Sequence, residues 1–237
     1  MDTAAQSARR AERAFFLFIA FAFLALVLWT FARTFYLKLV FGTPPLPLLL
    51  HIHGIVMTGW PVLLAVQTSL IASRHVQWHR RVGVFGTLWA GLVVLLGSVT
   101  TLHAAAREVQ GHTPMAKIQV FITTLDLLQM LLFAAFVTAA ILLRRRPDYH
   151  KRLMVLTIAC MLPDAFARLP VHFMTNARIL MGLDGFVLLC VAIDTFRHRR
   201  LHPAFGWGGL AFMLTFHVAL LTAMSPGWIA FASGLLS

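Results

Sequence analysis

Seven apolar stretches, each bounded by polar or basic residues, follow one another along the sequence. They cover approximately residues 14–36, 48–73, 82–104, 118–143, 153–173, 179–196 and 204–224. Most of them match or exceed the roughly 20 apolar residues that an α-helix needs to cross a bilayer. The pattern predicts an all-α, polytopic membrane protein, with a polar tail at residues 1–13 and a single seven-helix bundle over residues 14–237.

The segments between these stretches carry turn signals. GTPPLP at 42–47 is a stiff proline turn, and SPGW at 225–228 ends the last stretch before a short apolar tail. The first stretch is longer than the hydrophobic region of a signal peptide, so we predict that it is a membrane helix.

The composition agrees with this interpretation. Hydrophobic residues make up 59% of the chain and charged residues 12%, and the formal net charge is +12. In a soluble protein that charge would suggest a nucleic-acid partner, but no nucleic-acid-binding motif accompanies it. Cys160 and Cys190 lie inside apolar stretches without a CxxC neighbour, so we interpret them as small buried hydrophobic residues.

The basic residues gather at alternate ends of the predicted helices. One set of ends carries Arg9, Arg10, Arg13, Arg74, Arg80, Arg81, Arg144, Arg145, Arg146, Lys151, Arg152, Arg197, Arg199 and Arg200. The other set carries Arg33, Lys38, Arg107, Lys117 and Arg178. The positive-inside rule then predicts a cytoplasmic N-terminus and a periplasmic C-terminus in a bacterial inner membrane, with the lipid bilayer as the main partner.

A weak internal similarity relates two predicted helical hairpins. HRRVG at 79–83 joins the second and third stretches, and HKRLM at 150–154 joins the fourth and fifth, 71 residues later. Such duplication is common in membrane bundles, so it indicates architecture more than chemistry.

Ionisable residues inside the fifth stretch are the first functional signal. Asp164, Arg168 and His172 are spaced four apart, which would place them on one face of a helix. Charged groups at that depth are costly in lipid and usually face a bundle interior or a polar cavity. We therefore take Asp164 and Arg168 as candidate catalytic residues. A structural ion pair between them is an equally good interpretation.

Further histidines and aspartates fall in the outer half of the other predicted helices, whereas the cytoplasmic half is almost free of ionisable groups. Imidazole and carboxylate together suit a divalent metal such as zinc, iron or copper. The candidate metal ligands are His51, His53, His103, Asp126, His172, Asp184 and His217. This set predicts a metal-dependent membrane hydrolase or oxidoreductase that acts on a hydrophobic or small-molecule substrate.

Three other interpretations stay open. Individual histidines at the helix ends, such as His51, could be interfacial residues without a ligand role. A b-type haem could bind between His53 or His103 and His172 or His217, although haem would not explain the aspartates. The acids and histidines could also form the relay of a proton-coupled carrier.

Several short motifs resemble those of a known family. HIHGIVMTGW at 51–60, Gln67, HRRVG, Arg145, Arg146, HKRLM and Arg168 resemble uncharacterised bacterial integral membrane proteins of the DUF2306 type. The half from HKRLM to His172 is also similar to DUF420 proteins, some of which accompany haem–copper oxidase genes. The resemblance implies a helical membrane bundle, and for the second half an association with such an oxidase.

A second resemblance concerns topology. Seven spans with a cytoplasmic N-terminus are similar to the zinc-dependent progestin/adiponectin-receptor and ceramidase-like hydrolases. This sequence departs from that pattern, because its seventh stretch has the single His217 where those proteins have an HxxxH pair. Its polar layer also lies on the outer side.

Overall fold

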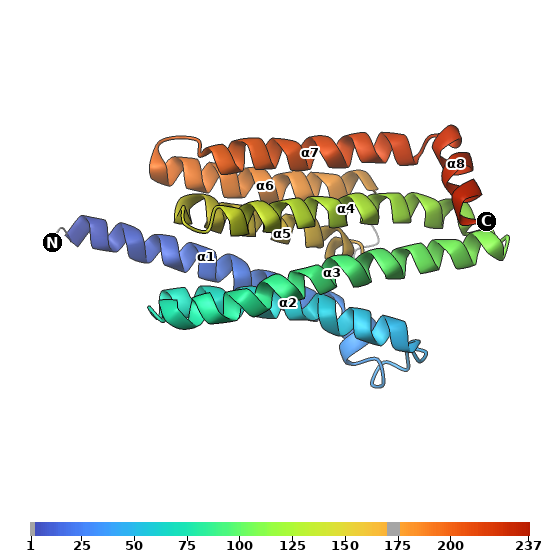
Figure 1. Cartoon of the computed structure of the whole chain (residues 1–237), viewed down its shortest axis with the longest axis horizontal. Coiled ribbons are helices and arrows are strands. Elements are labelled where there is room, and N and C mark those ends of the chain that lie inside the picture. The colour runs from blue at the N-terminus through green and yellow to red at the C-terminus, as the bar shows by residue number, and fades with distance from the viewer. Residues whose placement is uncertain (1–2, 170–175) are drawn as a thin grey trace. The chain divides into compact units, whose positions relative to one another are not determined.

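The computed structural model describes residues 3–169 and 176–237 (Figure 1). All regular secondary structure in these ranges is helical. The chain forms two compact units, residues 1–93 and 94–237, and each is described by itself below.

Unit 1 contains α1 (Thr3–Thr30), a short π-helical segment (Ala32–Tyr36), α2 (Leu48–Ala72) and the first half of α3 (Val76–Gln110). α2 begins directly after the proline turn, and Pro47 is the residue that precedes it. Proline has a fixed φ and no N–H, so it is tolerated at the start of a helix but not in its interior.

Side-chain contacts hold α2 against its neighbours in unit 1. α1 packs along α2. The Trp89 indole of α3 donates to the Val56 carbonyl of α2 at 2.9 Å. Gly59 leaves room for that ring, because a Cβ atom at this position would overlap it.

Unit 2 contains the second half of α3, α4 (Ala116–Leu142), α5 (Pro147–Phe166), α6 (Asn176–His198), α7 (Pro203–Ala223) and α8 (Pro226–Leu236). α4 and α5 pack against each other and against α7, α6 packs on α5 and α7, and α8 packs on α4 and α7. α5, α7 and α8 each start with proline, whose missing N–H costs nothing in the first helical turn.

Close packing between α5 and α7 depends on a glycine. Gly208 of α7 lies directly over Leu156 of α5, and a Cβ atom there would collide with the Leu156 side chain. Leu156 is fully buried, as are Phe133 of α4 and Phe212 of α7. Small residues at such a contact allow two membrane helices to approach closely.

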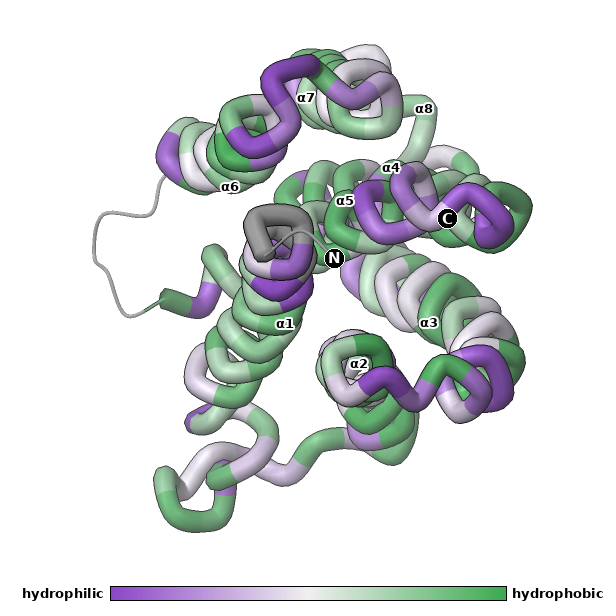
Figure 2. The backbone as a smooth tube through the Cα atoms, turned by 90° about the vertical axis from the view of Figure 1, so that its left-hand side faces the viewer, coloured by the Kyte–Doolittle hydropathy of each residue, from purple (hydrophilic) through white to green (hydrophobic). Residues whose placement is uncertain are grey.

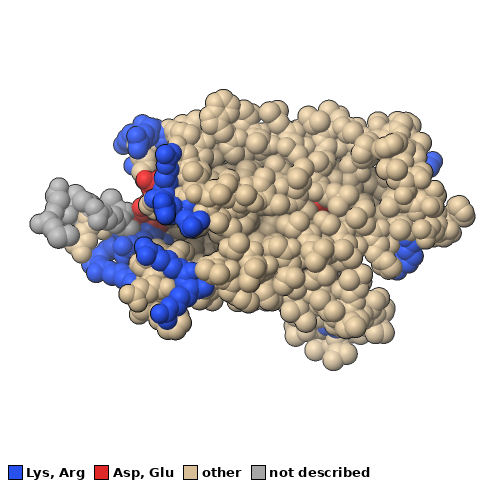
Figure 3. Space-filling model, viewed as in Figure 1, with Lys and Arg blue, Asp and Glu red and all other residues tan. Residues whose placement is uncertain are grey.

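The membrane prediction is confirmed at the level of a multi-pass helical protein. Within the described residues, six helices are long and apolar enough to cross a bilayer: α1 from Arg10 onward, α2, α3, α4, α6 from Ala177 onward, and α7. Hydrophobic residues run along the helices and hydrophilic ones lie mostly near their ends (Figure 2). On the visible face, Lys and Arg gather at helix ends and the surface between them is almost free of charge (Figure 3).

α5 is the predicted span that falls outside this set of six. Its twenty residues include four charged ones, Asp148, Lys151, Arg152 and Asp164. The prediction that this helix reaches Phe173 is wrong, because it ends at Phe166. The sequence places Pro170 directly after Leu169, and a residue before proline avoids the helical region. Hence Arg168 lies beyond the helix, and His172 lies outside the described residues.

Two other predicted boundaries also differ. The first stretch was expected to be one helix to Tyr36, but α1 ends at Thr30 and the π-helical segment follows. The third was expected over 82–104, but α3 extends it by about a turn or more at both ends. The polar residues at these ends still form helix, because backbone hydrogen bonds favour continuing an established helix.

The repeated HRR and HKR motifs occupy the same place in their hairpins. His150, near the start of α5, donates from Nδ1 to the Ala140 carbonyl of α4 at 2.8 Å. His79, near the start of α3, lies beside Gln67 of α2. With its amide turned so that both groups are satisfied, Gln67 donates to His79 Nδ1 at 2.6 Å. Each histidine therefore joins its helix to the preceding one.

Candidate functional site

A polar cluster joins α3 and α4 in unit 2. Asp126 of α4 accepts a hydrogen bond from Thr101 Oγ1 of α3 at 2.8 Å. Thr123, one turn before Asp126, donates to the Thr101 carbonyl at 3.1 Å. Both threonines are buried. The neutral Thr101 hydroxyl orients the Asp126 carboxylate without neutralising its charge.

Asp164 on α5 lies in the same part of unit 2. Its Oδ2 accepts from Gln129 Nε2 of α4 at 3.0 Å, and Gln129 is buried. Arg168 donates to the Asp164 backbone carbonyl at 2.9 Å, and its guanidinium is 3.9 Å from Asp164 Oδ1. The side chains of Asp164 and Arg168 are 49% and 41% exposed.

Gln129, which donates to Asp164, follows Asp126 by three residues on α4, and the charges of Asp164 and Arg168 both act on Asp126. We call this cluster the carboxylate-pair site; its members are Thr101, Thr123, Asp126, Gln129, Asp164 and Arg168. It brings together three predicted residues, Asp126, Asp164 and Arg168. The structural ion pair proposed for Asp164 and Arg168 is present, although 3.9 Å makes it a loose one.

Asp184 and His217 form a second pair, between α6 and α7. His217 donates from Nδ1 to the Met213 carbonyl of its own helix at 2.8 Å, which turns Nε2 toward Asp184. Nε2 is 3.5 Å from Asp184 Oδ2. Two of the candidate metal ligands thus meet here.

The remaining candidate ligands are placed individually. His51 and His53 lie near the start of α2 in unit 1, where His51 Nδ1 lies 3.3 Å from the Pro47 carbonyl. His103 of α3 is exposed. Within residues 3–169 and 176–237, no group of three or more His, Cys, Asp and Glu side chains is arranged to hold a metal ion. The metal and haem assignments therefore stay predictions.

The most completely buried charge in the described part of unit 2 is one that sequence reasoning missed. Arg152 of α5 donates to both carboxylate oxygens of Asp194 on α6, from Nε at 2.9 Å and Nη2 at 2.7 Å. Their side chains are 2% and 3% exposed. Arg152, which the sequence places among the basic helix-end residues, is therefore paired inside the bundle. The sequence predicts that this half of the helices is almost free of ionisable groups, and Asp194 is a buried exception.

Other groups surround this ion pair at the basic end of unit 2. Arg152 Nη1 donates to the Asp148 carbonyl at 2.8 Å. Lys151 donates to the Asp148 side chain at 2.7 Å and so lowers the pKa of that carboxyl. His202, buried at the start of α7, accepts from the Ala204 amide, and burial lowers its pKa.

A sequence signal for the Arg152–Asp194 pair does exist. Asp194 is the last acid before the basic run 197–200, at the end of an apolar stretch, and Arg152 holds the equivalent place at the start of another. Opposite charges near the same ends of neighbouring membrane helices favour pairing. The two joined helices, α5 and α6, are consecutive in the chain.

The arrangement in unit 2 therefore separates two kinds of polar group. Arg152 and Asp194 form hydrogen bonds to each other and are buried. Asp126 and Asp164 share one arginine and stay partly accessible, as a ligand or proton site requires. Comparisons with protein-family models, with curated proteins and with solved structures found no match to this chain.

Proposed function

We propose that this chain is a proton-coupled membrane carrier whose coupling proton binds at the carboxylate-pair site. The proposal rests on one observation: the carboxylate of Asp126, on the membrane-spanning helix α4, interacts with that of Asp164 on α5, and the Arg168 guanidinium lies 3.9 Å from Asp164 Oδ1. Ionised together, they leave the cluster with one negative charge in excess. A bound proton removes that excess, and removing charge is strongly favourable away from water.

The neighbouring donors assign a role to each acid. Asp164 has the positive charge of Arg168 beside it, 3.9 Å from its Oδ1. Asp126 accepts its hydrogen bond from the neutral hydroxyl of Thr101, and we assign the proton to this carboxylate. A hydroxyl can donate to the carboxylate or accept from the carboxylic acid, so Thr101 serves both forms.

The exposure of the side chains to solvent agrees with these roles of Asp164 and Asp126. Asp164 and Arg168 are about half exposed at the end of α5, whereas Thr101 and Gln129 are buried. A proton would reach Asp164 first and pass to Asp126. Arg168 would attract an anionic substrate group when the proton is bound, which couples the two.

The seven-span arrangement belongs to the same proposal, with a cytoplasmic N-terminus, a periplasmic C-terminus and a bacterial inner-membrane location. It is supported by the alternation of basic helix ends along the chain. The resemblance to DUF2306 and DUF420 proteins also stays a prediction.

Proton flux into liposomes tests the proposal. The purified protein is reconstituted with a pH-sensitive dye inside, and a potassium diffusion potential drives protons inward. Asp126→Asn should abolish the flux, because the amide mimics the protonated acid permanently. The matched control is Asp148→Asn, which removes an exposed acid that lies outside the cluster; it should leave the flux unchanged.

Infrared difference spectroscopy separates proton binding from transport. Wild-type protein should show a carboxylic-acid band that grows on acidification and disappears in Asp126→Asn. Flux that persists in both Asp126→Asn and Asp164→Asn would reject the proposal. Stoichiometric zinc, iron or copper in the purified protein, or a haem absorption band, would favour the metal or haem prediction instead.

A further inference from the structure

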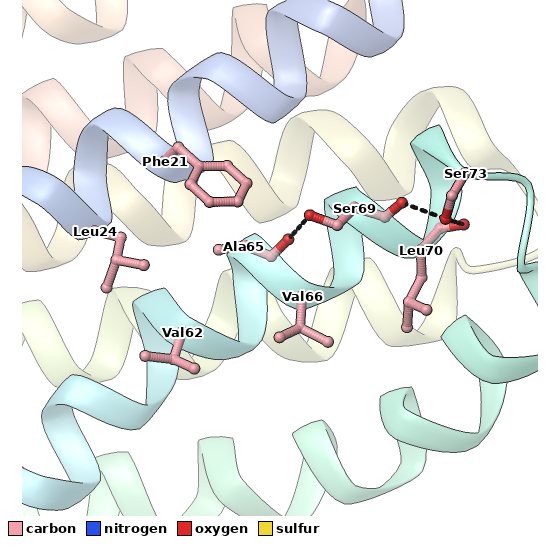
Figure 4. Close-up of a pocket in the computed structure, with 8 residues that line it drawn as sticks. All are labelled: Phe21, Leu24, Val62, Ala65, Val66, Ser69, Leu70 and Ser73. Carbon is pink, nitrogen blue, oxygen red and sulfur yellow. Dashed lines mark hydrogen bonds between the residues drawn. The ribbon is translucent and has the colours of Figure 1, made fainter.

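An apolar groove runs between α1 and α2 in unit 1 (Figure 4). Its volume is about 340 Å³. Phe21 and Leu24 of α1 line one side. The α2 side is lined by Val62, Ala65, Val66, Ser69, Leu70 and Ser73.

The two serines do not make the groove polar. Ser69 Oγ donates to the Ala65 carbonyl at 2.7 Å, and Ser73 Oγ donates to the Ser69 carbonyl at 2.8 Å, both within their own helix (Figure 4). Their hydrogens are thus already used, and the groove presents mainly hydrocarbon. Its natural occupant is an extended apolar chain.

The length and position of the groove match one bilayer leaflet. From Val62 to Ser73 the helix rises about 16 Å, at 1.5 Å per residue. Half of a hydrocarbon core about 30 Å thick is about 15 Å. The groove ends at Ser73, where α2 itself ends and the basic turn begins with Arg74.

Arg74 holds a conformation that arginine normally avoids. Its φ is +65°, and it closes α2 in a Schellman arrangement: the Arg74 amide donates to Ile71 O at 3.2 Å and the His75 amide to Leu70 O at 2.8 Å. Glycine is the residue that suits this position best. Arg74 is exposed and directly follows Ser73, a lining residue at the end of the groove, so a basic residue stands next to that end in the chain despite the backbone strain.

We propose that the groove binds one acyl chain of an anionic phospholipid, whose phosphate lies against Arg74. Arg80 and Arg81, exposed at the start of α3, contribute to the same positive field. The hydrocarbon walls select a lipid chain, and the cations select a negatively charged headgroup. This inference is independent of the proton site, because it concerns unit 1 alone.

Native mass spectrometry of the protein released from nanodiscs tests the proposal. The discs contain phosphatidylcholine alone or a mixture with phosphatidylglycerol. Wild-type protein should retain one phosphatidylglycerol in preference to phosphatidylcholine. Val66→Trp, which fills the groove, should lose it. Ile55→Trp, at an exposed aliphatic position on the same helix outside the groove, should retain it.

Arg74→Gly separates lipid binding from folding. It relieves the strain at φ +65°, so the protein should not lose stability, yet preference for phosphatidylglycerol should fall about fivefold with the loss of one interfacial cation. Arg199→Gly is the matched control: Arg199 also has a positive φ, at 54°, but lies in unit 2. It should leave the lipid bound. Equal retention of the two lipids by wild type, or unchanged retention by both Val66→Trp and Arg74→Gly, would overturn the proposal.

Discussion

At the scale of single residues, the Arg152–Asp194 pair buries two opposite charges almost completely at the basic end of unit 2. A buried ion pair contributes little net stability compared with apolar residues, but removing one member leaves an uncompensated charge. Asp194→Ala should therefore destabilise the protein by about 3–5 kcal/mol. Thermal unfolding in detergent measures this effect.

Two comparison variants test whether the loss of stability arises because Arg152 stays buried without its partner carboxylate. The double change Arg152→Met with Asp194→Leu should recover most of the stability, since it removes both charges together. Asp148→Ala removes an acid that is 64% exposed and should cost less than about 1 kcal/mol. A double variant no more stable than Asp194→Ala would contradict the explanation.

His202 should make stability depend on pH. Burial, with the positive charge of Arg152 as a second cause, lowers its pKa below the ordinary 6.5, against smaller opposite effects of Asp194 and Asp148. The folded protein therefore prefers neutral His202, whose Nδ1 caps α7 by accepting from Ala204 N. This contribution is complete above pH 6.5 and declines as the pH falls through the lowered pKa.

Melting temperatures of wild type and His202→Asn across that pH range test this prediction. Asparagine is a good N-cap that does not titrate, so the variant should stay stable at neutral pH and lose less on acidification. Identical pH profiles for the two proteins would exclude His202 as the source of the effect.

At the scale of elements, the α5–α7 contact depends on a missing side chain. Gly208→Ala should destabilise unit 2 by about 1–3 kcal/mol, because the added methyl collides with buried Leu156. Gly185→Ala on α6 is the matched control, since no described heavy atom lies within 4 Å of its added Cβ. It should gain up to about 1 kcal/mol from helix propensity. Chemical or thermal unfolding of the two variants checks the opposite signs.

The sequence predicted which segments form helices, but it predicted less well where those helices begin and end. All seven apolar stretches contain a helix, because backbone groups in lipid must be satisfied within the segment. α5 nevertheless ends before Arg168, and α3 runs through polar residues at both its ends. The hydropathy pattern reports only how apolar the side chains are. The ends of these helices depend instead on where prolines lie and on whether the backbone hydrogen bonds of the helix continue.

At the scale of the whole molecule, the number of crossings sets where the termini lie. In the part of the chain that the structure describes, six helices qualify as spans by length and composition, and α5 would be the seventh. If α5 crosses, Ser7 and Ser237 should lie on opposite sides of the membrane. Single cysteines at these positions, in a chain with Cys160 and Cys190 replaced, are labelled with an impermeant maleimide in intact vesicles. Labelling of both from the same side would contradict seven crossings.

The duplicated hairpins show why the candidate site was only partly predictable. Arg81 and Arg152 occupy equivalent motif positions, yet Arg81 is exposed beside Trp78 whereas Arg152 is buried against Asp194. The motif is local, but the partner acid is 42 residues away. In the same way, Asp126 and Asp164 come together, whereas Asp184 pairs separately with His217.

The sequence alone determined that this chain is a multi-pass helical membrane protein, because apolar length and charge placement act segment by segment in a bilayer. It also determined that acids and histidines must find partners inside that bundle. Only the tertiary structure decided which partners they find, dividing the acids between a closed Arg152–Asp194 pair and the open carboxylate-pair site. Helix rotation and packing bring residues distant in the chain within a few ångströms, and no local pattern encodes that rotation.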